Sequence, residues 1–181
     1  MKKGEIRRLV LSAVLVALGV VLARLFHALG GWQAGSIFLP MHITVLLCGL
    51  LCGWKYGMLC GILTPLTAML VSGMPTGAML ISMMLELGAY GVTAGFLYRM
   101  PLTKKSPLLK VVITLVLAML AGRAVYGIFG ALTSTGGGNA FGWTAFLSGA
   151  FIKAWPGILI QLVLLPTLMM VLRKGKWGEG L

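Results

Sequence analysis

Residues Met79–Val92 read MLISMMLELGAYGV, an apolar run that contains a single charged residue, Glu86. The chain has only three acidic residues, and the other two lie near its polar ends. Burying an unpaired charge in hydrocarbon costs several kcal/mol, so a carboxylate at this depth should face the protein interior and pair there. Arg123 and Lys153, each inside a later apolar run, are its predicted partners.

The composition indicates an integral membrane protein. Its 181 residues are 59% hydrophobic and only 10% charged, which is far outside the range of soluble domains. The net charge is +12, but most basic residues lie in short segments between apolar runs, where they set topology. We therefore expect a lipid bilayer as the environment of the chain and no nucleic-acid partner.

Six apolar segments are candidates to cross the bilayer. A span needs roughly 20 apolar residues at about 1.5 Å of rise per residue, and fewer where neighbouring helices shield it. The predicted spans are Leu9–Ala28, Ile37–Cys52, Tyr56–Val71, Ala78–Leu97, Val111–Leu132 and Trp143–Leu172. We expect Pro156 to kink the long sixth span. The predicted fold is an all-α polytopic membrane protein of six transmembrane helices, forming one domain over residues 1–181.

The segments between the spans alternate in charge. Basic residues precede the first span, follow the sixth, and occupy the second–third and fourth–fifth loops. The loops Leu29–Ser36, Ser72–Gly77 and Thr133–Gly142 contain no charged residue. The positive-inside rule then places both termini and the basic loops in the cytoplasm, and the neutral loops outside. Because glycine and proline concentrate in the neutral loops, we expect these to be irregular, compact or mobile.

Three charged residues lie at a similar depth in the predicted spans. Counted from the outer ends, Glu86, Arg123 and Lys153 are all roughly 12–15 Å deep. One interpretation is a structural ion pair between Glu86 and one base. In the other, two cations and one anion leave a surplus positive charge in a cavity open to the outside, which a small carboxylate-bearing ligand would neutralise. Tyr90 and Tyr126 lie on the same helical faces and are also candidate contacts.

Further candidates lie near the predicted outward mouth. Arg24 either snorkels towards the lipid headgroups or binds ligand. His42 is either an interfacial or core histidine or a ligand contact. Trp32, in the first outward loop, either covers a ligand or anchors the chain at the membrane interface. The candidate contacts from this region are Arg24, Trp32, Gln33, His42 and Asn139.

The first span carries a helix-contact pattern. Ala13 and Ala17 lie four residues apart on one helical face, which lets another helix approach closely. With the basic N-terminus, the segment FLPMH at Phe38–His42 and the segment LELGAYG at Leu85–Gly91, this chain resembles the substrate-binding S components of energy-coupling factor (ECF) transporters. The resemblance covers nearly the whole chain and looks most like the pantothenate-type branch.

The resemblance implies a small six-helix membrane subunit that binds a vitamin or related micronutrient near the outer face, with the outward loops as its lid. It also implies that Ala13 and Ala17 dock onto a transmembrane T component driven by two ATP-binding subunits. The chain contains no GxxxxGK[ST] phosphate loop, so we expect no cofactor in this chain and use of ATP by the partner subunits. The expected location is a bacterial cell membrane.

The main alternative is a stand-alone secondary transporter, in which Glu86 carries a proton. An enzyme is disfavoured because the sequence contains no HExxH, no GxSxG and no paired carboxylates. The three cysteines lack neighbouring His or Asp, so we interpret them as packing residues and expect no metal site. The sequence thus predicts a non-enzymatic subunit that captures a small carboxylate, such as pantothenate, for ATP-driven import.

Overall fold

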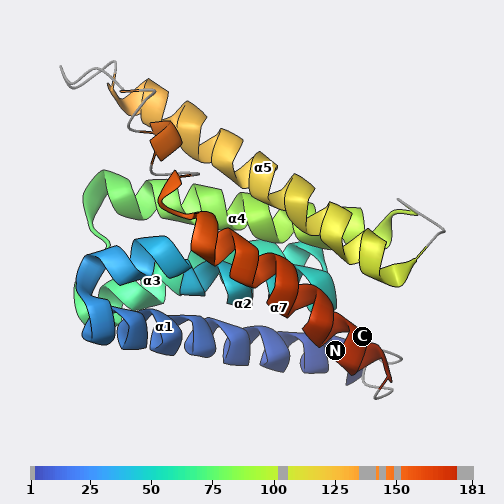
Figure 1. Ribbon diagram of the computed structural model, residues 1–181. Coiled ribbons are helices and arrows are strands. Elements are labelled where there is room, and N and C mark those ends of the chain that lie inside the picture. The colour runs from blue at the N-terminus through green and yellow to red at the C-terminus, as the bar shows by residue number, and fades with distance from the viewer. Residues whose placement is uncertain (1–2, 102–105, 135–141, 143–145, 149–151, 175–181) are drawn as a thin grey trace.

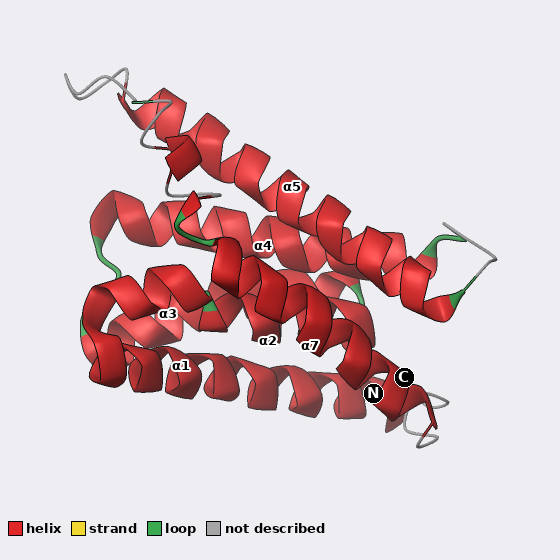
Figure 2. Ribbon diagram, in the orientation of Figure 1, coloured by secondary structure: helices red, strands yellow, loops and turns green. Residues whose placement is uncertain are grey.

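The computed structural model is a bundle of α-helices (Figure 1) and describes residues 3–101, 106–134, 142, 146–148 and 152–174. The labelled helices are α1 (Lys3–Phe38), α2 (Pro40–Cys52), α3 (Trp54–Ser72), α4 (Gly77–Arg99), α5 (Pro107–Ser134) and α7 (Trp155–Lys174). Figure 2 shows helices joined by short loops, with no strand in the described ranges. The predicted all-α class is confirmed.

Five of the described helices are long and apolar enough to cross a membrane, namely α1, α3, α4, α5 and α7. Large apolar side chains on their outer faces are exposed, for example Val21 at 62% and Val163 at 67%, as expected for helices that face lipid. The α2 helix has only 13 residues, about 20 Å of length against about 30 Å of hydrocarbon. The chain is therefore a membrane protein, and the second of its six predicted spans is too short to cross the bilayer alone.

The first predicted outward loop is largely helical. The α1 helix continues past the expected end at Ala28 to Phe38, and two glycines interrupt it. Gly31 has a φ of 64°, a left-handed conformation that glycine adopts without a Cβ clash. The chain then turns at Leu39, whose φ is 51°, and α2 begins at Pro40. A glycine break followed by a turn therefore brings this segment back over the end of the bundle.

The last helix is shorter than the predicted sixth span, Trp143–Leu172. Since α7 covers Trp155–Lys174, Pro156 lies in its first turn, where the missing N–H costs no helical hydrogen bond. The predicted kink at Pro156 is therefore wrong, and the proline inside the described helix is Pro166. Lys153 lies in the turn that precedes α7.

Glycines bring α2, α3 and α4 into backbone contact. A Cβ atom added at Gly91 of α4 would overlap the backbone of Gly57 on α3. A Cβ atom at Gly49 of α2 would lie 2.7 Å from the carbonyl oxygen of Gly91. Small residues at such contacts allow membrane helices to approach closely. Because Gly91 lies little more than one helical turn after Glu86, this contact sets the position of Glu86 relative to α2.

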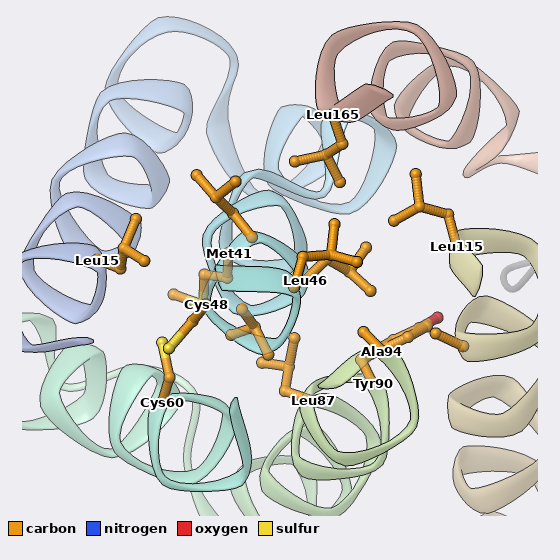
Figure 3. Close-up of a cluster of buried hydrophobic side chains, with 14 of the residues drawn as sticks. Leu15, Met41, Leu46, Cys48, Cys60, Leu87, Tyr90, Ala94, Leu115 and Leu165 are labelled. Carbon is orange, nitrogen blue, oxygen red and sulfur yellow. The ribbon is translucent and has the colours of Figure 1, made fainter. Parts of the chain in front are cut away.

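The core surrounds α2, which packs against α1, α3, α4 and α7. Figure 3 shows Leu46 of α2, Leu87 of α4, Leu115 of α5 and Leu165 of α7 converging in one cluster, and all four are fully buried. The three cysteines of the chain are also buried and free. Their burial among apolar side chains agrees with their interpretation as packing residues.

The start of α1 and the end of α7 lie at the same end of the bundle (Figure 1). The end of α4 and the start of α5 lie at that end too, whereas α5 ends at the opposite one (Figure 1). The helices thus alternate in direction. Which end faces the cytoplasm stays a prediction from the charges of the loops.

Candidate functional site

A cavity of about 290 Å³ lies at the end of the bundle opposite the chain ends. It is lined by the second half of α1, the start of α2, the end of α3, the α3–α4 loop, the first half of α4 and part of α5. Small-molecule sites in proteins usually measure about 300–1,000 Å³ and combine apolar walls with a few polar groups. The acidic, basic and imidazole side chains in its described lining are Arg24, His27, His42, Glu86 and Arg123. The cavity therefore has the size and composition of a site for a small metabolite.

Glu86 is the point on which three helices converge. Its side chain is 4% exposed, and its Oε1 atom lies 2.9 Å from Nη1 of Arg123 on α5. The hydroxyl of Tyr90, one turn along α4, donates a hydrogen bond of 3.3 Å to the same oxygen. His42 of α2 places its Nε2 atom 3.7 Å away, which is longer than a hydrogen bond. The predicted pairing of Glu86 with Arg123 is present in the structure.

Arg123 and His42 retain nitrogen atoms that no described protein group satisfies. Nη2 of Arg123 and both ring nitrogens of His42 are buried without a hydrogen-bond partner among the described residues. Both side chains line the cavity and are more than nine-tenths buried. An unsatisfied buried polar group costs about 1–3 kcal/mol. The arrangement therefore favours a ligand that brings hydrogen-bonding atoms to these nitrogens.

Lys153 does not belong to this cluster. Its side chain is exposed, and it is not among the described residues that line the cavity. The prediction placed it well inside a continuous sixth helix, but α7 begins only at Trp155. The prediction that Lys153 shares a buried level with Glu86 is therefore wrong. The ionisable group that joins Glu86 and Arg123 is His42, which the sequence placed nearer the mouth.

The two candidate tyrosines occupy different positions. Tyr90 is 2% exposed and lies behind Glu86, outside the described cavity lining, with its ring edge-on to His42 at a centroid distance of 5.1 Å. It therefore orients Glu86 and His42 rather than facing the cavity. Tyr126 does line the cavity, and its ring stacks on Phe146 at 5.9 Å.

Arg24 lines the cavity and is exposed to solvent or lipid, so its role as a ligand contact stays a prediction. Asn139 lies outside the described residues, as do the side chains of Trp32 and Gln33. Sequence reasoning missed most of the apolar wall, which includes Met41, Met74, Met79 and Met83. No spacing distinguishes these methionines from the other apolar residues of the spans, although methionine suits an adaptable binding surface.

Ala13 and Ala17 precede the part of α1 that lines the cavity, which begins at Val20, and neither alanine is in the described lining. Both are on the exposed side of the helix, whereas Ser12 and Leu15 face the bundle. Val14, beside them, is 56% exposed. The face predicted for docking is thus available to another membrane helix.

Comparison with protein families matches residues 7–169 to the family described as "ECF transporter, substrate-specific component". No curated protein and no solved structure matches the chain. The matched range covers nearly all of α1 to α5, the whole described cavity lining, and most of α7. The family comprises substrate-binding subunits rather than enzymes, and these associate in general with T and ATPase subunits. This chain belongs to the family of substrate-specific components of ECF transporters and is a substrate-binding membrane subunit.

Proposed function

We propose that the cavity beside Glu86 captures a small carboxylate-bearing vitamin or related micronutrient, such as pantothenate, for ATP-driven uptake by partner subunits. One observation carries the proposal. Arg123 lines the cavity and pairs through Nη1 with Glu86, while its Nη2 has no partner among the described residues. A ligand carboxylate would supply acceptors to this unsatisfied donor.

The charges around the cavity favour an anion. Two arginines, Arg24 and Arg123, line it, against one carboxylate, Glu86. The arginine and carboxylate charges of the described lining therefore sum to one surplus positive charge. The surplus cation that the sequence argument assigned to Lys153 is instead Arg24, near the mouth. Arg24 is exposed and partly screened by solvent, so its charge attracts an anionic ligand modestly, whereas the buried Arg123 is the stronger attraction.

The remaining surface of the cavity favours a ligand with an aliphatic body. The walls are mostly apolar, with Val20, Ala23 and Leu39 beside the four methionines. His42, when neutral, offers one donor and one acceptor. Pantothenate combines one carboxylate, a branched aliphatic part, and hydroxyl and amide groups, so its chemistry matches each part of this surface.

We further propose that the cavity opens to the outer face of a bacterial cell membrane, with both termini in the cytoplasm. Support comes from the uncharged segments near the cavity and the basic residues at the other end of the bundle. Ala13 and Ala17 would dock onto the T component, and two ATP-binding subunits would use the ATP, so this chain itself would need no cofactor.

A stand-alone secondary transporter is the weaker proposal. Family membership argues against it. Glu86 is already engaged by Arg123 and Tyr90, so protonating it would leave Arg123 as an uncompensated buried charge. Uptake into vesicles that carry only this chain and a proton gradient is therefore expected to be absent.

The proposal is tested by calorimetry on the folded, detergent-solubilised chain, after mass spectrometry has identified any small molecule that copurifies with it. Pantothenate is compared with panthenol, in which an alcohol replaces the carboxylate. We expect panthenol to bind at least roughly 30-fold more weakly, since loss of one member of a buried charge pair costs about 2–5 kcal/mol. Equal binding of the two, or copurification of a cationic ligand, would rule out the anion site.

A further inference from the structure

A second cavity, of about 1120 Å³, lies at the end of the bundle opposite the Glu86 cavity. It is surrounded by five helix ends, namely the start of α1, the end of α2, the end of α4, the start of α5 and the end of α7. Figure 1 shows the starts of α1 and α5 and the end of α7 at the end of the bundle that carries both chain ends. The two cavities thus have no described lining residue in common and lie at opposite ends of the bundle.

The inner walls of this second cavity are apolar. Three helices contribute leucine and methionine side chains, among them Leu15 of α1, Leu47 and Leu50 of α2, and Met169 of α7. These four side chains are at most 8% exposed. These apolar walls offer a polar solute no hydrogen-bonding partner, whereas the hydrocarbon chains of the surrounding lipid would cover them.

Cationic side chains also line this cavity. They come from four different helices, and they are Arg7, Arg99, Lys110 and Arg173. No acidic residue is among the described lining residues. Without Arg7, which has another interaction, three cations still line this cavity.

The contacts of two of these cations position them without cancelling their charge. Arg99 donates a hydrogen bond from Nη2 to the carbonyl oxygen of Cys52 at 3.2 Å. Lys110 places its Nζ atom 5.1 Å from the centre of the Tyr98 ring. Neither a carbonyl nor an aromatic ring carries a net charge, so both cations can still attract an anion.

We propose that this second cavity binds one anionic phospholipid from the leaflet at that end of the bundle. Its phosphate would lie near Arg99, Lys110 and Arg173, and its acyl chains would cover the apolar walls. A free phosphate would meet the cations but leave the apolar walls uncovered, whereas a neutral lipid tail would leave the cations without a counter-charge. Basic pockets between transmembrane helices are a known mode of anionic lipid recognition.

The test uses the full chain in detergent, stripped of lipid and then mixed with phosphatidylglycerol, phosphatidylcholine or glycerol 3-phosphate at equal concentration. Native mass spectrometry counts bound molecules, and thermal unfolding reports stabilisation. The test variant combines Arg99→Gln, Lys110→Gln and Arg173→Gln. The control is Lys55→Gln, because Lys55 lies over the Trp54 ring at 5.6 Å, much as Lys110 lies over Tyr98, but does not line the cavity.

We expect phosphatidylglycerol to be retained and to stabilise the wild type and Lys55→Gln, with retention at least tenfold weaker in the triple variant. High salt should weaken retention by screening the cations. The proposal is overturned if phosphatidylcholine is retained equally, if glycerol 3-phosphate stabilises as well as the lipid, or if the folded triple variant retains the lipid normally. If the triple variant does not fold, the proposal is judged from the wild type alone, by comparing its retention of phosphatidylglycerol with its retention of phosphatidylcholine. None of these readouts depends on vitamin binding.

Discussion

Arg123 of α5 places Nη1 2.9 Å from Oε1 of Glu86 on α4, and both side chains are buried inside the bundle. Two neighbouring helices are therefore joined by a charge pair away from water. Such a pair contributes little net stability, because desolvation offsets its attraction, but loss of one partner leaves an uncompensated charge. The pair lines the cavity, so it couples the packing of α4 against α5 to ligand binding.

The first prediction concerns this pair. Arg123→Met should weaken ligand binding by roughly 30-fold or more and lower stability by about 3–5 kcal/mol, because it leaves the Glu86 carboxylate buried with Tyr90 as its donor. Glu86→Gln should reduce affinity less, since Arg123 can still meet an anionic ligand. The variant that combines Arg123→Met with Glu86→Gln should lose less stability than the sum of the losses in the two single variants. Thermal unfolding and calorimetry in detergent measure these effects, and additive losses would contradict the coupling.

The second prediction compares two cations, Arg24 and Lys153. Arg24 lines the cavity and is exposed, whereas Lys153 is exposed and lies outside the described lining. Arg24→Gln should lower affinity for an anionic ligand by about 2- to 5-fold, because solvent screens a charge at the mouth. Lys153→Gln should leave affinity unchanged. Calorimetry at low and high salt checks both, and an affinity loss confined to Lys153→Gln would restore the sequence-based assignment.

The third prediction tests the glycine contact. A methyl group at Gly91 would overlap the backbone of Gly57, so Gly91→Ala should destabilise the protein by about 1–3 kcal/mol and shift Glu86. Gly88→Ala is the matched control, because its Cβ would meet only Ile62, at 3.8 Å. It should be neutral or stabilising, since alanine favours helix over glycine by about 0.5–1 kcal/mol. Thermal unfolding measures the stability of both variants. If Gly91→Ala is as stable as Gly88→Ala, the close contact between α3 and α4 is not needed for stability.

The fourth prediction concerns partner docking. Ala13→Leu or Ala17→Leu should reduce uptake by the assembled transporter, because a bulky side chain blocks close approach of a partner helix. Ligand affinity of the isolated chain should stay unchanged, since both residues lie on the exposed face of α1 and neither lines the cavity. Ala124→Leu, on an exposed face of α5, is the matched control. An equal loss of uptake in that control, or a loss of ligand binding in the α1 variants, would count against docking through α1.

The fifth prediction tests sidedness. Thr76, in the uncharged loop before α4, should react as Thr76→Cys with an impermeant thiol reagent added outside intact cells. Ser106→Cys, before α5 in a basic loop, should react only after the membrane is opened. The native cysteines are buried, so background labelling should be low. The reverse pattern would invert the proposed orientation and place the Glu86 cavity on the cytoplasmic side.

The helical architecture was readable from the sequence because apolar run length and loop charge are local properties. Long apolar segments such as that around Leu115 must satisfy their backbone groups internally in lipid, and a helix does so within one segment. The pairing of Glu86 with Arg123 was readable for an energetic reason. A lone carboxylate in a long apolar run needs a counter-charge, and few bases are available at that depth.

Tertiary packing decided which side chains meet Glu86. His42 approaches it because the turn at Leu39 and the contact between Gly49 and Gly91 set α2 against α4. Lys153 does not, because the chain leaves the helical path before Trp155 and the count along a continuous helix no longer applies. Helical periodicity predicts which residues share a face of one helix, but which faces meet depends on contacts between distant segments, such as that of Gly57 with Gly91.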